Sequence, residues 1–248
     1  MFFQRKPEET ALHIAVLYND HKRILQLRED EELLQEKNSL GFTALEIARL
    51  LGKTKCIEIL QPEPKRIIKI AQKGENLYSE YSLEQFEQFF KIKLLQRQLF
   101  KDYAFLKEVI KQCPWVLKWS PSGEANRSLG KRYQEELSQA HTPDMTIRWI
   151  HEDISYGVYT NDALEAGDYI GEYTGSVREL DPLSPDHNSY CLQYPTSNWS
   201  KRILMVDAQK GGNILRFINH SDEPNLSPVC LLDRGLLHLV FLAGSSIS

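Results

Sequence analysis

The sequence predicts an α+β protein, in which an all-α helical region at the N-terminus is followed by a β-rich domain. Two observations predict this division. A six-residue motif near the N-terminus returns 33 residues later, as happens in helical repeats. After Met145 the helical periodicity gives way to short strand-like runs between turn residues. A third feature, the apolar run that ends in Asn219-His220-Ser221, marks the candidate functional site, because buried polar side chains need partners.

Composition and charge narrow the class of protein. Of the 248 residues, 42% are hydrophobic and 26% are charged, which is typical of a folded domain. No apolar run approaches the roughly 20 residues that span a bilayer, and the N-terminus has no signal-peptide core. We therefore expect an intracellular protein, cytoplasmic or nuclear, without a membrane partner. The net charge of -4 argues against a direct nucleic-acid partner.

The cysteines are too scattered for a structural metal site. No Cys-x-x-Cys pair or Cys/His cluster occurs, so we expect no bound metal and reduced thiols. The four cysteines are Cys56, Cys113, Cys191 and Cys230.

The repeated motif resembles a pair of ankyrin repeats. Thr10-Ala11-Leu12-His13-Ile14-Ala15 returns as Thr43-Ala44-Leu45-Glu46-Ile47-Ala48, which is the ankyrin period. Each copy predicts an inner helix, a turn and an outer helix, and Gly41 and Gly52 suit turn positions with positive φ. We assign residues 1–62 to this pair. The resemblance implies a surface that binds a protein partner.

Two repeats bury too little surface to be stable alone, so the next segment is expected to cap them. Residues 63–119 are predicted as this helical cap, with one helix at 65–72 and a long one from Ser82 to about Gln112. Ser82 and Gln85 form a capping-box pattern, and apolar residues at helical spacing follow. Residues 120–144, rich in Ser, Gly, Pro and Asn, are predicted as a linker around one short helical piece at Lys131–Ala140.

Residues 145–248 resemble the SET-domain protein lysine methyltransferases. The two motifs that carry this resemblance are Tyr169-Ile170-Gly171-Glu172-Tyr173-Thr174-Gly175 and Arg216-Phe217-Ile218-Asn219-His220-Ser221. The resemblance implies methyl transfer from S-adenosylmethionine to a lysine of a protein substrate. Histones are common substrates of the family. Such a transfer needs no metal, but it needs a neutral amine shielded from water.

The resemblance also implies site residues. Tyr190 matches the tyrosine at the channel between cofactor and lysine and is the expected catalytic residue. The expected cofactor-binding residues are Ile154, Ser155, Tyr156, Gly157, Tyr190, Arg216, Phe217, Asn219 and His220. Ser155 stands where the family has a glycine, and a negative φ there would preserve backbone contacts.

The sequence departs from the family at its end. Val240-Phe241-Leu242-Ala243 is followed by Gly244 to Ser248, where the family has a strand that carries tyrosines. The SET domain is therefore predicted to lack its C-terminal strand and to transfer methyl groups poorly. Two functions stay open: a lysine methyltransferase whose ankyrin pair recruits substrate, and a SET-like binding module whose ankyrin surface does the work.

Overall fold

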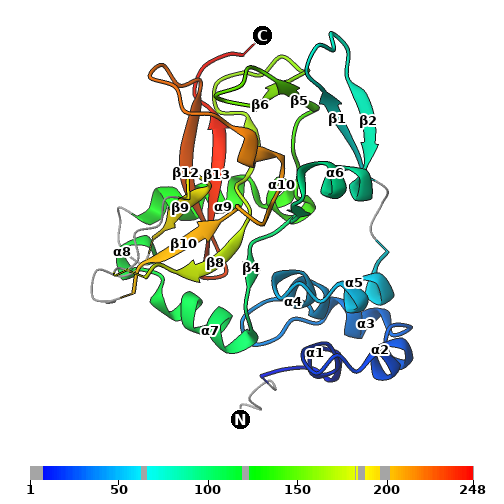
Figure 1. The fold of residues 1–248 in the computed structure, drawn as a ribbon. Coiled ribbons are helices and arrows are strands. Elements are labelled where there is room, and N and C mark those ends of the chain that lie inside the picture. Colours follow the sequence, from blue (N-terminus) through cyan, green and yellow to red (C-terminus); the bar gives the residue numbers. More distant parts are fainter. Residues whose placement is uncertain are drawn as a thin grey trace. The chain divides into compact units, whose positions relative to one another are not determined.

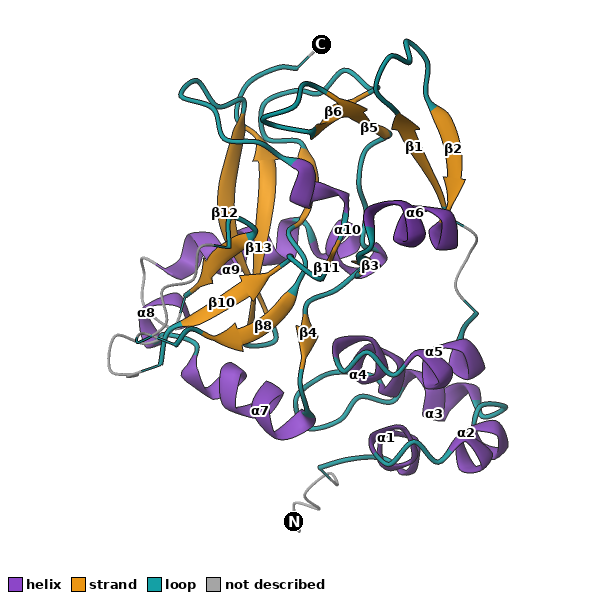
Figure 2. Ribbon diagram, viewed as in Figure 1, coloured by secondary structure: helices purple, strands orange, loops and turns teal. Residues whose placement is uncertain are grey.

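A computed structural model describes residues 8–62, 66–118, 123–181, 183, 188–195 and 202–247. The chain divides into two compact units. The first is Met1–Pro64 with Leu99–Lys107, and the second is Lys65–Gln98 with Glu108–Ser248. Figures 1 and 2 show helices dominating the first unit and strands mixed with helices in the second. No helix among the described residues is both long and apolar enough to cross a membrane.

Two helix pairs at the predicted spacing make up most of the first unit. Thr10 and Thr43 cap the first helix of each pair by accepting a hydrogen bond from the backbone three residues on. Thr43 and Glu46 complete a capping box. Gly41 and Gly52 adopt φ of 85° and 63°, which confirms the turn prediction. The helices are α1 (Ala11–Leu17), α2 (His21–Leu27), α3 (Glu31–Gln35), α4 (Ala44–Leu50) and α5 (Thr54–Leu60).

Buried polar contacts tie the first unit together. The His13 ring is fully buried; its Nδ1 lies 2.8 Å from Thr10 Oγ1 and its Nε2 lies 2.9 Å from the carbonyl oxygen of Phe42. Tyr103, from the inserted segment, donates its hydroxyl hydrogen to Glu9 and accepts a hydrogen bond from Asn38. Burial, followed by the Glu9 carboxylate, raises the pKa of Tyr103. The assignment of this unit to ankyrin repeats stays a prediction.

The second unit is built on several small sheets. One has the order β2–β1–β5–β6, with β1 parallel to β5 and the other pairs antiparallel; another has the order β12–β13–β7 and is antiparallel. β8, β10 and β9 pair in that order, and β11 pairs with β3. Their bounds are β1 (Ile67–Ala71), β2 (Ser79–Ser82), β3 (Lys93–Leu94), β5 (Met145–Trp149), β6 (Tyr156–Thr160), β7 (Tyr169–Glu172), β8 (Ser176–Glu179), β9 (Cys191–Tyr194), β10 (Leu204–Asp207), β11 (Gly211–Gly212), β12 (Leu226–Asp233) and β13 (Leu236–Ala243).

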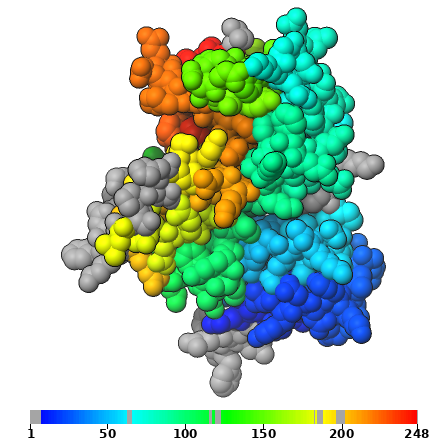
Figure 3. Space-filling model, viewed as in Figure 1, coloured from blue at the N-terminus to red at the C-terminus, as the bar shows by residue number. Residues whose placement is uncertain are grey.

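The helix predicted at 65–72 is wrong, because the described part of that segment forms strand β1. Its isoleucines are β-branched, a residue class that favours strands, and Ile68 and Ile70 are buried. β1 lies between β2 and β5, so tertiary pairing decided the conformation. Figure 3 shows the cyan and teal surface of this region beside the green surface around residue 150.

The long helix predicted from Ser82 to Gln112 is also wrong, although its start is confirmed. Ser82 and Gln85 form the expected capping box. The helix then stops because Lys91 adopts a left-handed φ of 54°. Asp102 caps the next helix by accepting a hydrogen bond from the Phe105 amide. The elements in this stretch are α6 (Leu83–Phe90), β3, β4 (Leu99–Phe100) and α7 (Tyr103–Gln112).

The segment predicted as a linker is largely helical where it is described. α9 (Glu124–Arg132) and α10 (Gln134–Gln139) follow the short helix α8 (Trp115–Lys118). Tyr133, between α9 and α10, is buried and packs on Tyr169, with ring centres 5.5 Å apart. This aromatic contact belongs to a core cluster that also contains residues of β12 and β13. The linker prediction was wrong, because a segment of mostly polar composition contains a few residues, such as Tyr133, that pack into the core.

Strand β12 was not predicted from the sequence. It pairs over its whole length with β13 through a two-residue turn at Arg234 and Gly235, whose φ values are 49° and 81°. Two consecutive positive φ values define the primed turn that hairpins favour. The hairpin packs against α9 so closely that a Cβ on Gly130 would lie 2.3 Å from the Leu232 carbonyl oxygen.

This close approach predicts whether a substitution at Gly130 raises or lowers the free energy of unfolding. Glycine to alanine inside a helix normally stabilises by about 1 kcal/mol. Gly130→Ala should instead destabilise by about 1–3 kcal/mol, because the methyl group would collide with backbone. Urea unfolding of the full chain measures the difference. Ser128→Ala, at an exposed position of the same helix, is the control and should be neutral or mildly stabilising; a stabilised Gly130→Ala would contradict this packing.

Candidate functional site

A tight turn leads into strand β6 and holds Ser155. The Ser155 amide donates to the His151 carbonyl oxygen at 2.7 Å, and the Ser155 carbonyl accepts from the Ile150 amide at 2.7 Å. Ser155 adopts a φ of 64°, so the condition of a negative φ is not met. The left-handed conformation suits glycine, and a serine there costs about 1–2 kcal/mol.

The first residues of β6 meet the Asn-His-Ser segment directly. Asn219 donates from Nδ2 to the Tyr156 carbonyl oxygen at 3.1 Å. A Cβ on Gly157 would lie 3.0 Å from Asn219 Nδ2 and 2.6 Å from Ile150 Cδ1, so a side chain at this position would force its neighbours apart. The two motif segments, far apart in sequence, are therefore adjacent in the fold.

An aromatic cluster supports this junction. The Tyr156 ring centre lies 5.1 Å from that of Phe90 and 6.4 Å from that of Phe217, and Phe90 and Phe217 are 4.7 Å apart. Burial raises the pKa of Tyr156, and Tyr81 and Glu75 add to the rise. Phe90 comes from α6 and was not predicted as a site residue. Its helical spacing from Phe86 predicted only that the two side chains pack on the same face of a helix.

Arg216 connects the same segment to Tyr190. Arg216 is 8% exposed, and its guanidinium carbon lies 4.0 Å from the centre of the Tyr190 ring. Its Nε donates to the Ala208 carbonyl oxygen at 2.9 Å. Burial lowers the pKa of Arg216, while Tyr190 and Tyr173 oppose the change. The cation is thus held between a carbonyl and an aromatic face, which stabilises a charge away from water.

A polar network that the sequence did not reveal fixes the backbone of Tyr190. The Tyr173 hydroxyl donates to the Tyr190 carbonyl oxygen at 2.8 Å, and the Tyr190 amide donates to Asn188 Oδ1 at 2.9 Å. Asn188 in turn donates to Asp207 at 2.8 Å, and Arg178 Nε donates to the same carboxylate at 2.6 Å. Burial alone would raise the pKa of Asp207, but hydrogen bonds from the Gln209 amide and these side chains outweigh it and the pKa is lowered.

Two predicted site residues lie apart from these contacts. The His220 side chain is 91% exposed and its Nε2 lies 3.6 Å from Asp222 Oδ1. Ile154 is 43% exposed. Asn219 is also exposed, so the polar end of the segment is open to a ligand. Within the described ranges, no three His, Cys, Asp or Glu side chains are placed to hold a metal ion.

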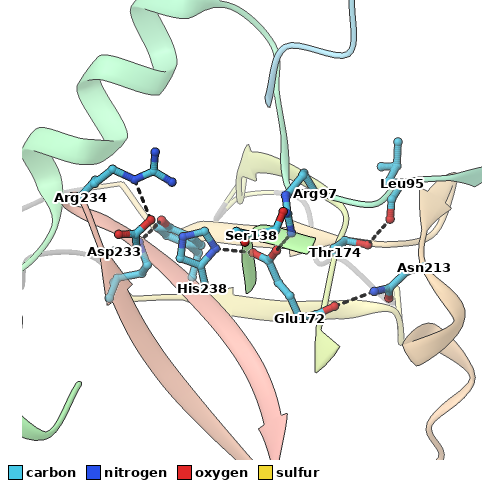
Figure 4. Close-up of polar contacts among 11 residues, drawn as sticks. Leu95, Arg97, Ser138, Glu172, Thr174, Asn213, Asp233, Arg234 and His238 are labelled. Carbon is cyan, nitrogen blue, oxygen red and sulfur yellow. Dashed lines mark hydrogen bonds and ion pairs between the residues drawn. The ribbon is translucent and has the colours of Figure 1, made fainter. Parts of the chain in front are cut away.

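Beneath the site, β7 carries a buried ion pair, drawn in Figure 4. Glu172 Oε1 lies 2.6 Å from His238 Nδ1, and both side chains are less than a tenth exposed. Arg97 Nη1 lies 3.8 Å from the other carboxylate oxygen. Asn213, which precedes the 3-10 helix Ile214–Phe217, donates to the Glu172 carbonyl oxygen at 2.7 Å. The ion pair therefore sits under the segment that leads to Asn219.

Comparison with known proteins gives a match in the C-terminal part of the chain. Residues 155–248 match the family model of the SET domain. The chain is 34% identical to the putative histone-lysine N-methyltransferase 1 of Plasmodium falciparum (isolate 3D7) over 128 residues, which are 50% of this chain and 2% of that protein. It is 27% identical to the histone-lysine N-methyltransferase ash1 of Drosophila melanogaster over 150 residues, which are 57% of this chain and 6% of that protein.

A solved structure gives a partial match. The crystal structure of KRYPTONITE in complex with mCHH DNA, H3(1-15) peptide and SAH has a TM-score of 0.36 and 30% identity, covering 45% of this chain and 22% of that chain. This chain thus spans only a small part of the proteins that it resembles.

The φ of Ser155 predicts a stabilising substitution. Ser155→Gly should raise the free energy of unfolding by about 1 kcal/mol, because glycine adopts a positive φ without the Cβ clash. Asp153→Gly is the control, because Asp153 lies in the same turn but has no positive φ. Glycine there should lower the free energy of unfolding, since it increases the conformational entropy of the unfolded chain. Chemical unfolding compares both with the unaltered chain. Destabilisation by Ser155→Gly would show that the serine does not strain the turn.

The buried ion pair predicts non-additive energetics. Glu172→Gln and His238→Leu should each destabilise by about 3 kcal/mol, because each leaves a buried polar partner without its counter-group. The double variant should lose less than the sum of the two, since the contact between the two side chains can be lost only once. Urea unfolding of the four proteins gives the coupling. Additive losses would mean that the two side chains do not stabilise one another.

Proposed function

We propose that the SET domain of this chain transfers a methyl group from S-adenosylmethionine to a lysine of a protein substrate. The observation that carries the proposal is the hydrogen bond from Asn219 to the Tyr156 carbonyl, which joins the two segments expected to bind the cofactor. Tyr190, the expected catalytic residue, is linked to the same junction through Arg216.

The residues present suit this cofactor, which supplies a methyl group on a positively charged sulfur. Ser155, Tyr156 and Gly157 form a stretch that lies against Asn219, where Gly157 leaves no room for a side chain. Asn219 and His220 offer exposed polar side chains that can bind the ligand's polar atoms. Ile154 precedes this stretch and is partly exposed, and the buried Phe217 packs against the Tyr156 ring.

Tyr190 would orient the lysine amine. Its backbone is fixed on both sides, by Asn188 and by Tyr173, so its ring position is defined before substrate binds. A lysine brought against the Tyr190 ring would lose water, and this desolvation lowers its pKa and favours the neutral amine that reacts. The names of the relatives support a histone-type or other protein substrate, and with it a nuclear or cytoplasmic site of action.

The test measures cofactor binding and transfer together. Asn219→Ala should weaken binding of S-adenosylmethionine by about 1–3 kcal/mol, because polar groups of the ligand lose their partner and the tie to Tyr156 is lost. Isothermal titration measures the affinity, and transfer of a radiolabelled methyl group to mixed core histones measures the reaction. Asn225→Ala, at another exposed asparagine, is the control. Equal affinities of Asn219→Ala and the unaltered chain would refute the assignment.

A second candidate function is a binding module without turnover, with an ankyrin pair as the working surface. The observation in its favour concerns equivalent positions of the two helix pairs. Ile47 is fully buried, whereas Ile14, the same position in the first pair, is 47% exposed. An apolar side chain at a repeat surface can contact a protein partner. Cofactor binding without any methyl transfer in the assay above would favour this function over the enzyme.

A further inference from the structure

The ring of Phe90, on helix α6, contacts both of the segments that are expected to bind the cofactor. Its centre lies 5.1 Å from that of Tyr156, the first residue of β6, and 4.7 Å from that of Phe217, two residues before Asn219. The Tyr156 and Phe217 rings are themselves 6.4 Å apart. Phe90 is therefore nearer to each of these two rings than they are to one another.

The orientation of the rings makes these contacts directional. The plane of the Phe90 ring is inclined by 84° to that of Tyr156 and by 52° to that of Phe217. Edge-to-face pairs are favoured because the positive edge of one ring meets the negative face of the other. An aliphatic side chain of similar volume fills space without this preference, so it would hold the two neighbouring rings less firmly.

Helix α6 fixes the place of Phe90 at both of its ends. The capping box fixes the first turn. Phe86, one turn before Phe90, is fully buried in a core cluster with residues of β1 and β5. Just beyond the helix, the Leu94 amide donates to Glu87 Oε1 at 3.0 Å. The Phe90 ring is thus held by the packing of the helix, independently of any ligand.

The contacts of Phe90 bear on both ends of one hydrogen bond. Tyr156, whose ring Phe90 contacts, accepts this bond at its carbonyl oxygen, and Asn219, which follows Phe217 closely, donates it at 3.1 Å. Hydrogen bonds weaken steeply when donor and acceptor are misaligned. A shift of either ring would therefore move the donor or the acceptor of the bond that joins the two cofactor segments.

We propose that Phe90 is a positioning residue for cofactor binding, which sets the spacing of the Tyr156 and Asn219 segments and through them the affinity for S-adenosylmethionine. The proposal rests on the proposed function and adds to it a residue outside the matched range 155–248. Phe86 separates this role from general packing. Within the described part of the chain, the Phe86 ring contacts those of Phe90 and Phe217 but not that of Tyr156.

The experiment measures the affinity of the full chain for S-adenosylmethionine by isothermal titration, well below the melting temperature of every variant. Phe90→Leu should weaken binding about tenfold, because small displacements of binding groups cost much of their interaction with a ligand. Phe90→Met, whose flexible side chain adapts to the space around it, is a second variant with the same expected loss.

Phe86→Leu is the matched control, because it makes the same change one turn earlier on the same helix. Phe86 is fully buried and Phe90 is half-buried, so Phe86→Leu should lower the melting temperature at least as far as Phe90→Leu does. It should nevertheless weaken cofactor binding by less than about threefold, since Phe86 does not contact the Tyr156 ring. Equal losses of affinity for the two variants would overturn the proposal.

A double-variant cycle tests whether Phe90 acts through the Asn219 hydrogen bond. The bond is already absent in Asn219→Ala, so adding Phe90→Leu to that variant should weaken binding by less than about threefold. A loss of about tenfold on both backgrounds would overturn the proposal, because independent contributions add. No binding by the unaltered chain would refute the proposed function and this proposal with it, whereas binding that Phe90→Leu leaves unaffected would refute this proposal alone.

Discussion

The hydrogen bond between the Asn219 side chain and the Tyr156 carbonyl is the contact on which the candidate site depends. The two residues are 63 positions apart, and the bond spans the meeting point of strand β6 with the chain that follows the 3-10 helix. The bond forms because Gly157 has no side chain, since a Cβ there would crowd Asn219. One glycine and one amide thus decide whether two distant motifs can face the same ligand.

This junction is supported by chain that precedes it. Phe86 and Phe90 of α6 contact Phe217, and Phe90 also contacts Tyr156. Strand β1 pairs with β5, so the same early segment extends the sheet that contains β6. Residues 155–248 match the SET family, yet part of the core behind their motifs is supplied by residues outside that match. The packing that fixes the candidate cofactor residues therefore draws on a wider part of the chain than the motifs do.

The features that were predicted correctly from the sequence are those that depend on residues close together in the chain. The capping residue Ser82 and the turn glycines Gly41 and Gly52 were predicted correctly, because caps and positive φ depend on a few neighbouring residues. Short strands after Met145 were predicted from strand-like runs between turn residues, although β12 was not among them. Strand β1 was mistaken for a helix, since its conformation depends on partners far away in the sequence.

The candidate site likewise contains features that the sequence predicted and features that it did not. Asn219 and Arg216 were named from their motif, and the structure brings them to Tyr156 and Tyr190 respectively. The support of Tyr190 by Asn188 and Asp207 could not be predicted, because neither residue has a spacing that marks it before the strands pair. His220 belongs to the motif, but its side chain faces solvent, so its part in binding depends on a ligand reaching it.

Two features near the junction oppose stability, and both lie on segments that carry the motifs. Ser155 holds a positive φ that a glycine would hold without strain, and Glu172 is buried against His238, where its carboxyl group loses its hydration. Such features persist only where surrounding contacts impose them. Here the contacts are identifiable: hydrogen bonds of 2.7 Å to His151 and Ile150 enforce the turn, and Asn213 and Arg97 enclose the carboxyl group of β7 and its backbone. A sequence selected for stability alone would remove the cost at Ser155 with a single substitution, and the cost of the buried pair by replacing both partners with apolar residues. Ser155 directly precedes Tyr156, and Glu172 is joined through Asn213 to the segment that leads to Asn219, which is what a site shaped for a ligand would produce.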